Sequence, residues 1–411
     1  MRKNRLGVIF TFIIVLALLI VGVIASIVGD IISNNKKNSA NSRDENTVEL
    51  TFVYAYQNRQ WAEAISETVE AFEEENPDVE IQCLVQYENR VYEDALTRLY
   101  ARNELGDIMQ FKTPYYFAEC GALGEIPDEV CDDLVDATYS YNDTVYGVSA
   151  LATTCGVLYN KTVFEEYGLE EPKTYGEFLE ICKKLKKKGV TPLLYAGADL
   201  WHSEYFLNHF LHVYDGDAKK SFSTFKALFD AGYVNEDWQT VEDGTTAYLM
   251  AQGKAAMIFT ACSTMGEIKG EESDCEFGWF YLPDESGETV ITDTKDAYLC
   301  ITKECERDDE KYDAAVRFLK YFYSEDNYSN VLKKIYAIST TEQKTDTLVD
   351  GNYEKIVDGY FANERKDSYI GDYRHVQGFE RTILQDVPMF LTGQIDLEKI
   401  TDDYDRGGGD E

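Results

Sequence analysis

Apolar and polar residues alternate in several short segments of the chain. Residues 47–56, TVELTFVYAY, place an apolar side chain at every second position from Val48 to Tyr54, and residues 79–87, VEIQCLVQY, repeat the pattern. A period of two is typical of a strand with one buried face. We therefore expect strands in both segments, and further strands at residues 107–111 (DIMQF), 145–160 (VYGVSALATTCGVLYN), 191–195 (TPLLY), 276–283 (EFGWFYLP) and 297–303 (AYLCITK).

Helical spacing fills most of the intervals between these segments. From Trp61 to Phe72 the apolar residues recur every three or four positions, and the same spacing runs through residues 310–324. A third helix has clear ends, because Thr174 and Glu177 form a capping box before it and Gly189 follows it. The first three strands thus alternate with two helices. This order predicts an α/β fold with doubly wound lobes.

The charge of the chain excludes some partners. Residues 1–40 hold five basic side chains and one acid, and subtracting this +4 from the formal net charge of −36 leaves about −40 on the rest. Such a surface repels phosphate backbones, so we expect no nucleic-acid partner. The 30 Tyr, 21 Phe and 4 Trp residues argue against disorder in spite of this charge.

The start of the chain has the length and flanks of a membrane segment. An uncharged run extends from Leu6 to Gly29 behind the basic residues Arg2, Lys3 and Arg5. We expect a transmembrane helix with a cytoplasmic N-terminus, which places the bulk of the chain outside the cell membrane. A cleaved signal peptide is the alternative interpretation. Residues 1–46 would then be anchor or signal segment plus linker, with a flexible tether after the apolar run.

Catalytic and metal-binding signatures are absent from the sequence. It contains no C-x-x-C pair, no phosphate-binding Gly-Lys-Ser/Thr loop, no Gly-x-Ser-x-Gly and no His-Glu-x-x-His. His202, His209 and His212 share a helical face, but we interpret them as structural. The nine cysteines are an odd number and stand mostly in apolar contexts, which favours buried thiols. We expect no cofactor, no metal and no enzyme activity.

Several motifs, in order along residues 47–403, resemble the carbohydrate-class extracellular solute-binding proteins of ABC importers, the maltose-binding-protein-like family. The motifs are FEEENPDVEI, GDIMQF, the long segment from VYGVSALATTCGVLYNKTVF to KKKGVTPLLYAG, GKAAMIFTACSTMGEI, FGWFYLPDESGE, AAVRFLKYFYSEDN and FLTGQIDLEKI. Each is moderately specific by itself, and the ordered set carries the resemblance.

The resemblance implies a two-lobed α/β fold with the ligand in a cleft between lobes joined by hinge strands. The first lobe would comprise residues 47–151 and 293–335, and the second residues 156–290 and 340–403. Residues 404–411 would be a flexible tail. The implied function is capture of a sugar or oligosaccharide outside the cell and its delivery to the subunits of an ABC permease. An extracellular polysaccharide-active enzyme and a ligand sensor remain alternatives.

Ligand-binding residues are expected in the loops after the strands, because open α/β sheets bind ligands beyond the carboxyl ends of their strands. Aromatic plates beside polar side chains suit a sugar, which has apolar ring faces and a rim of hydroxyls. For Trp201, packing beneath the cleft is an equal alternative. The candidates are Tyr56, Gln57, Arg59, Tyr87, Glu88, Asn89, Phe111, Thr113, Tyr115, Trp201 and Phe379.

The chain departs from the family pattern at three places. Many relatives have a Trp after the Gly-Lys-Ala-Ala-Met motif, where this chain has Ser263 and Met265. The family's Pro-Asp-Ile is Gly-Asp-Ile here, and we expect Asp107 to brace a turn. No cysteine precedes Cys83, so no lipid-acceptor cysteine follows the apolar run. The missing Trp argues against a typical oligosaccharide contact and leaves the ligand class open.

Overall fold

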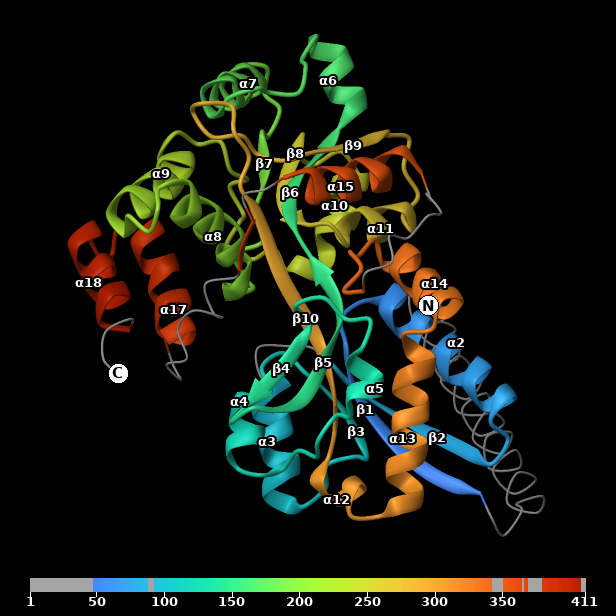
Figure 1. Ribbon diagram of the computed structural model, residues 1–411. Coiled ribbons are helices and arrows are strands. Elements are labelled where there is room, and N and C mark those ends of the chain that lie inside the picture. The colour runs from blue at the N-terminus through green and yellow to red at the C-terminus, as the bar shows by residue number, and fades with distance from the viewer. Residues whose placement is uncertain (1–46, 88–91, 342–349, 364–365, 369–378, 408–411) are drawn as a thin grey trace, which may run out of the picture.

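Two α/β lobes, one below the other in Figure 1, make up the molecule. The computed structural model describes residues 47–87, 92–341, 350–363, 366–368 and 379–407. The predicted membrane segment lies outside these residues. Among the helices that the model describes, none has both the length and the apolar character needed to cross a membrane.

The first lobe is built on a sheet with the strand order β2-β1-β3-β10-β5-β4. Strands β1, β2 and β3 are parallel, whereas β10 runs antiparallel to β3 and β5 on either side of it. The strands are β1 (Val48–Tyr56), β2 (Val79–Tyr87), β3 (Ile108–Phe111), β4 (Thr138–Tyr141), β5 (Thr144–Thr153) and β10 (Ile291–Ile301), and the helices are α2 (Arg59–Glu75), α3 (Tyr92–Arg102), α4 (Tyr115–Glu119), α5 (Asp128–Cys131), α12 (Lys303–Glu306), α13 (Asp309–Phe322) and α14 (Glu325–Ile335).

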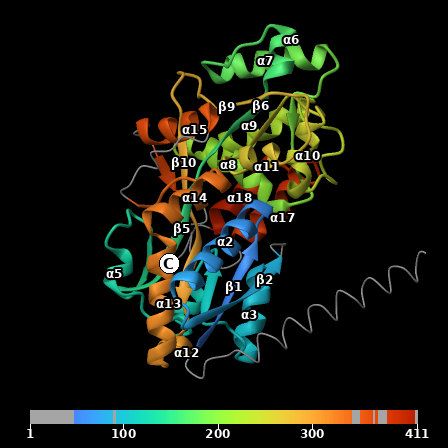
Figure 2. The same ribbon diagram turned by 90° about the vertical axis from the view of Figure 1, so that its right-hand side faces the viewer.

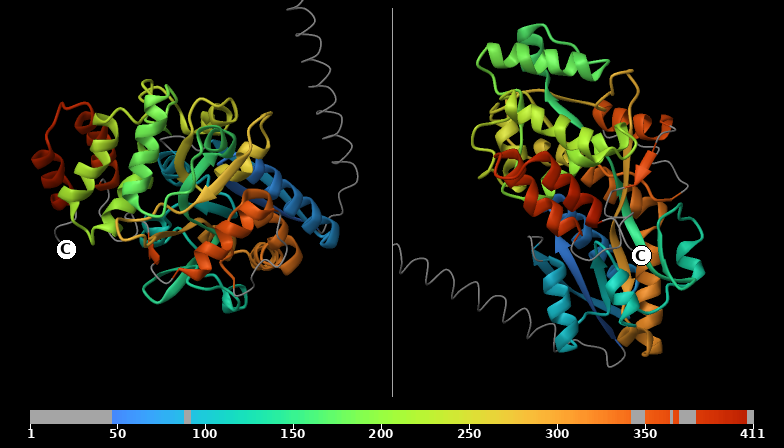
Figure 3. Two further views of the ribbon diagram at one scale, coloured as in Figure 1. Left: turned by 90° about the horizontal axis from the view of Figure 1, so that it is seen from above. Right: turned by 90° about the vertical axis from the view of Figure 1, so that its left-hand side faces the viewer.

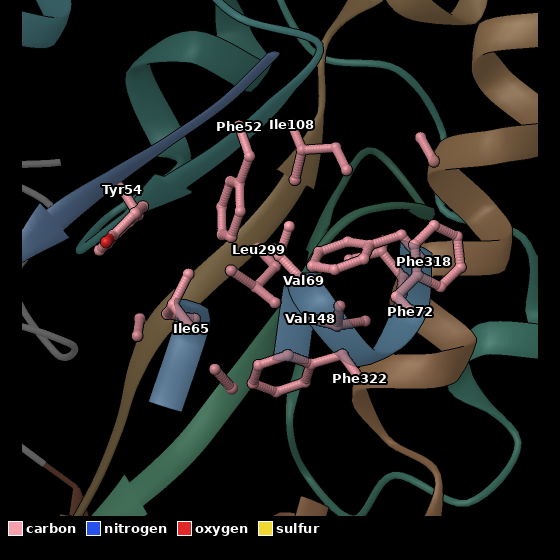
Figure 4. Packing of buried hydrophobic residues seen from close by; sticks show 14 of the residues in the cluster. Phe52, Tyr54, Ile65, Val69, Phe72, Ile108, Val148, Leu299, Phe318 and Phe322 are labelled. Atoms are coloured by element: carbon pink, nitrogen blue, oxygen red, sulfur yellow. The ribbon is translucent and has the colours of Figure 1, made fainter. Parts of the chain in front are cut away.

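The apolar stripe predicted on the first helix forms the core of this lobe. Val69 and Phe72 of α2 pack with Phe318 of α13 over the sheet residues Phe52 and Leu299 (Figure 4). The rings of Phe72 and Phe318 meet edge to face at 5.3 Å. Burying one such side chain typically stabilises a fold by about 1.5 to 3 kcal/mol. The core therefore fixes α2, whose N-terminus points to the other lobe.

The second lobe surrounds a smaller sheet with the order β7-β8-β6-β9. Helices α17 and α18 lie on its outer side against α8 and α9 (Figure 3). Its strands are β6 (Cys155–Asn160), β7 (Leu193–Leu194), β8 (Met257–Ala261) and β9 (Phe277–Phe280), its short 3-10 turns are η1 (Leu200–His202) and η2 (Asp243–Thr245), and its helices are α6 (Lys161–Tyr167), α7 (Tyr175–Lys187), α8 (Ser203–Val213), α9 (Ala218–Asp230), α10 (Thr246–Ala251), α11 (Thr264–Lys269), α15 (Gly351–Ala362), α17 (Phe379–Leu391) and α18 (Leu397–Gly407).

Helix α18 changes the prediction for the C-terminus. The helix continues to Gly407, so the first four residues of the expected tail are helical. The reason is packing, because Tyr404 is 6% exposed and its ring lies 5.9 Å from that of Phe222 on α9. Residues 408–411 lie outside the described part of the chain.

Three chain segments cross between the lobes side by side. One is the passage from β5 to β6 through the buried Thr154, and the second is β10. The third contains Ile338, which exchanges two backbone hydrogen bonds of 2.8 and 2.9 Å with Ala152 of β5. The first three residues of β10 also pair with β11 (Lys366–Ser368). Adjacent segments that cross between two lobes in this way can act as a hinge.

Candidate functional site

The carboxyl ends of the parallel strands in the first lobe meet at the lobe boundary. Tyr56 and Tyr87 are register partners at the ends of β1 and β2. Asn58 follows β1 and caps α2, since its side-chain oxygen accepts a 2.8 Å hydrogen bond from the Trp61 backbone N–H. The short linker between β1 and α2 therefore holds polar side chains where ligands bind in open α/β sheets.

The second lobe presents acidic and aromatic side chains on the facing side. His202 Nδ1 lies 2.8 Å from Asp243 Oδ1, and the Asp243 backbone N–H donates to Asp199 at 2.7 Å. These contacts fasten η1 to η2 and fix the start of α8, which carries Glu204 and Tyr205. Burial, followed by the charge of Asp243, raises the pKa of Tyr205 well above its usual range. The phenol thus stays neutral and keeps its O–H proton.

Helix α2 of the first lobe touches α11 of the second lobe (Figure 2). Asn58 Nδ2 donates to Glu267 Oε1 at 2.9 Å, and Gln60 Nε2 donates to the backbone oxygen of Gly266 at 3.4 Å. The Arg59 guanidinium lies beside Gly270, where an added Cβ would be 2.8 Å from Nη2. We call this set of contacts the α2–α11 bridge.

Glu267 is the ionisable group at the centre of the bridge. Burial raises its pKa to about 7, and the charges of Asp243 and Glu271 act in the same direction. The hydrogen bond from Asn58 acts in the opposite direction but does not offset them. Near neutral pH this carboxyl group is therefore divided between its protonated and ionised forms.

A second contact between the lobes involves a predicted site residue. The Nζ atom of Lys112, in the loop after β3, lies 5.7 Å from the ring centre of Trp201 in η1. The Trp201 ring is partly buried and meets Tyr205 edge to face at 5.7 Å. Lys112 thus lies over a ring that is anchored by a neighbouring aromatic residue.

The other predicted residues of the first lobe differ in exposure. Tyr56 and Gln57 are partly buried, whereas the Arg59 side chain is 63% exposed and lies 3.6 Å from the carboxylate of Glu63. Thr113 is exposed after β3. Tyr115 begins α4, is partly buried, and packs edge to face on Tyr141 at 5.9 Å.

The structure corrects the expectation for Phe111. Its side chain is 0% exposed, and its ring lies 4.5 Å from that of Phe117 in α4. The last residue of β3 therefore belongs to the core, because α4 folds back over this side of the strand. Phe111 supports the loop from beneath and has no surface for a ligand.

Less can be said of the four remaining predicted positions. Tyr87 is the last residue of β2, and Phe379 is the first residue of α17. Glu88 and Asn89 lie outside the described residues.

Sequence reasoning missed the principal polar residues of the boundary. These residues are Asn58, Glu204, Tyr205, Asp243 and Glu267. A chain with 75 acidic residues gives no reason to select three of them. The signal for Asn58 was present, because Asn is a preferred cap residue directly after a predicted strand.

Asp107, His202 and His209 have structural roles, although Asp107 links two elements and does not brace a turn. The Asp107 carboxylate accepts a 2.7 Å hydrogen bond from the Thr51 backbone N–H and lies 2.9 Å from Lys311 Nζ. His202 is held by Asp243, and His209 is 3% exposed with its ring 5.4 Å from that of Phe259. Within the described ranges, no group of three His, Cys, Asp or Glu side chains is placed to hold a metal ion.

The cysteines are free thiols in the structure. Five of the nine are buried, namely Cys155, Cys182, Cys262, Cys300 and Cys305. Burial raises the pKa of Cys182 and Cys262, so these thiols stay protonated and unreactive. They fill space in the core as small apolar groups.

Two concave surfaces lie away from the lobe boundary. One, of about 530 Å³, is lined by α2 and α14 and includes the acidic residues Glu67, Glu75 and Glu325. The other, of about 810 Å³, is lined by α7 and the loop before it. Neither holds a residue of the boundary described above.

Comparison with known proteins identifies relatives of the whole two-lobed unit. Residues 57–328 match the family model described as bacterial extracellular solute-binding protein. The multiple sugar-binding protein of Streptococcus mutans is 23% identical over 345 residues, covering 73% of this chain and 79% of that protein.

Solved structures show the same fold. A chitin oligosaccharide binding protein superposes with a TM-score of 0.78 at 19% identity, covering 88% of this chain and 99% of its own. The solute-binding protein RafE in complex with raffinose gives a TM-score of 0.73 at 18% identity, covering 88% of this chain and 100% of its own.

Proposed function

Because the chain belongs to the bacterial extracellular solute-binding proteins, we propose that it captures a saccharide between its two lobes and delivers it to an ABC permease. The similarity to a multiple sugar-binding protein and to structures of oligosaccharide-binding proteins supports a sugar as the ligand. The family also implies that the two lobes lie on the extracytoplasmic side of the membrane.

One structural observation supports a saccharide site between the lobes, beyond what membership of the family implies. The strand ends of the first lobe face aromatic and acidic side chains of the second lobe at the same boundary, as the Lys112–Trp201 and Asn58–Glu267 contacts show. The Trp201 ring offers an apolar plate for a sugar face. Carboxylates accept hydrogen bonds from the hydroxyls around the rim of a sugar, and side-chain amides both donate to them and accept from them.

The hinge supplies the mechanism of capture. A ligand that contacts both lobes favours the arrangement in which both sets of contacts form. The three crossing segments let the lobes close as rigid bodies, because each lobe keeps its own sheet and core. The permease would recognise the closed arrangement. We assign the carboxylate of Glu204 to the ligand, that of Asp243 to the contact between η1 and η2, and that of Glu267 to the contact between the lobes. We assign none of them to a catalytic step.

Of the candidates named from the sequence, we keep those at or near the boundary as proposed ligand contacts. Trp201 and Tyr115 are the aromatic plates, and Gln57 is a polar partner. We add Tyr205 and Glu204, which lie in α8 of the second lobe. Phe111 is omitted because it is buried.

Isothermal titration of the purified full chain tests the proposal. The panel contains raffinose, maltose, chitin oligosaccharides and common monosaccharides, each also incubated with the protein and analysed for breakdown products. We expect heat from at least one intact saccharide and no product. Turnover of a saccharide would favour the polysaccharide-active enzyme, and absence of heat with the whole panel would contradict sugar capture.

We further propose that the N-terminal apolar run is retained as a single-pass anchor. Its length, its basic flank and the lack of a lipid-acceptor cysteine support retention. The tether after it would keep the binding lobes near the permease. A sensor that passes the closed state to a signalling partner would use the same anchor, and permease genes beside the coding gene would favour import.

A further inference from the structure

The α2–α11 bridge joins the two lobes through a carboxyl group that is surrounded by other acids. We propose that the bridge is a pH-sensitive latch, in which protonation of Glu267 favours the arrangement with the lobes in contact. The proposal concerns regulation of the sugar-binding site and rests on the proposed function only for its effect on ligand affinity. The bridge itself is a property of the two lobes alone.

The hydrogen bonding of the Glu267 carboxylate depends on the position of the other lobe. Its carboxylate receives the Asn58 side-chain N–H across the boundary at 2.9 Å, and the neighbouring Gly266 oxygen receives Gln60. Both donors stand at the start of α2, whose position is fixed by the core of the first lobe. Movement of the lobes about the hinge would therefore separate these groups and admit water to Glu267.

The charged groups around Glu267 are mostly acidic. Asp243 of η2 and Glu271 after α11 act on it directly, and Glu204 and Glu267 both act on Tyr205 in α8. The cations near the bridge are already paired. Arg59 pairs with Glu63, Lys269 pairs with Asp350, and Lys334 of α14 pairs with Glu67. Ionised Glu267 thus has one neutral donor in Asn58 and several repelling neighbours.

The direction of the pH effect follows from proton linkage. In the bridged arrangement the pKa of Glu267 is about 7, against 4.5 for an ordinary glutamate. Between these values the bridged arrangement binds more protons than one in which water reaches the carboxylate. Lowering the pH from above 7 therefore stabilises the bridge, and this contribution is lost as the pH rises through 7. Below 4.5 both arrangements are protonated and the full contribution is present.

A shift of this size sets an upper limit of roughly 300-fold on the change in the equilibrium between the two arrangements. Part of the burial of Glu267 comes from its own lobe and remains when the lobes separate. We therefore expect a change of about tenfold between about pH 8 and about pH 5.5. Because a saccharide held between the lobes favours the bridged arrangement, its affinity should rise by a similar factor on acidification.

Two measurements on the full chain, purified in detergent, test the latch. The first needs no ligand: hydrogen exchange of the backbone amides of α2 and α11 at both pH values, corrected for the intrinsic pH dependence of exchange. The wild type should show stronger protection at the lower pH. Glu267→Gln, which mimics the protonated group, should show strong protection at both. Glu272→Gln, an exposed neighbour, is the matched control and should behave as the wild type.

The second measurement is the affinity for whichever saccharide of the panel binds, at the same two pH values. Wild-type affinity should rise about tenfold on acidification, and that of Glu267→Gln should stay constant and high. Protection that does not depend on pH in the wild type, or affinity that falls on acidification, would overturn the latch. If no saccharide binds but protection follows the expected pattern, the latch stands and the sugar assignment fails.

Discussion

Trp201 is the residue on which the binding proposal depends most. Replacing Trp201 or Tyr115 by Ala removes an aromatic plate that typically contributes about 1 to 3 kcal/mol, or roughly 5- to 150-fold in affinity. We expect both variants to bind the saccharide more weakly by such a factor and to melt close to the wild-type Tm. Titration and thermal melting measure the two effects.

Ile181 provides the control for this pair of variants. It is 7% exposed in the core of the second lobe, so Ile181→Ala should lower the free energy of unfolding by about 2 to 5 kcal/mol. Its affinity per folded molecule should not change. If Trp201→Ala and Tyr115→Ala instead melted early and bound normally, both rings would be core residues.

Phe111 should show the opposite behaviour to Trp201. Because the ring is fully buried against Phe117, Phe111→Ala should cost about 3 to 5 kcal/mol of stability. Denaturant unfolding measures this loss, and titration of the folded fraction should give wild-type affinity. A variant with normal stability and weak binding would restore Phe111 to the binding site.

The residue scale is where the sequence is least informative. Phe111 and Tyr115 both stand in an aromatic loop after a strand, and only the packing of α4 makes the first a core residue and leaves the second partly exposed. Glu267 is one acid among 75 acidic residues, and its importance arises from its contact with Asn58, which lies 209 residues away in the chain. No local pattern contains that contact.

At the scale of elements, Asp107 is a brace between β1, β3 and α13. Asp107→Ala would leave the Thr51 backbone N–H without its partner and remove the contact with Lys311. An unpaired buried donor costs about 1 to 3 kcal/mol, so we expect a loss of that order in chemical unfolding.

Asp313 gives a matched comparison for Asp107. It also carries a carboxylate paired with a cation of α13, Arg317, but its side chain is 72% exposed. Asp313→Ala should therefore cost less than about 1 kcal/mol. Equal losses in the two variants would mean that the brace at Asp107 contributes no more than a surface ion pair.

Elements with strong periodicity and clear caps were predicted well. The helix α7 begins after Thr174, whose hydroxyl accepts the Glu177 N–H at 3.2 Å, and it is followed by Gly189 with a φ of +76°. The strand β10 was predicted only from residue 297, whereas it begins at Ile291. The pattern is interrupted because the residues from Asp293 to Asp296, where the strand crosses between the lobes, are only partly buried on both faces.

At the scale of the whole molecule, a testable property is the attachment of the mature protein to the membrane. If the apolar run from Leu6 to Gly29 is a retained anchor, the mature protein should fractionate with membranes and keep Met1 or its near neighbours. Membrane fractionation and N-terminal sequencing of the native protein measure this. A mature N-terminus between Ala25 and Asn46 would show cleavage and contradict the anchor.

The two-lobed architecture follows from features that a sequence displays over long stretches. Alternating strands and helices indicate the α/β class, and the ordered motifs indicate the pair of lobes. The relative placement of the lobes does not follow in this way, because it depends on a few contacts such as Asn58–Glu267 and Lys112–Trp201. The proposed binding site lies at the boundary that these contacts form, which explains why the fold was easier to predict than the site.

The position of β10 in the chain has a consequence for export. This strand separates β3 from β5 at the centre of the first sheet, yet it follows every strand of the second sheet in sequence. Until residues 291–301 have been synthesised, β3 and β5 each lack the neighbour that β10 provides. The first lobe cannot complete its core before then. Late pairing between distant segments slows folding. A protein that crosses the membrane as an extended chain gains from this delay, since its early segments stay unfolded long enough to be translocated.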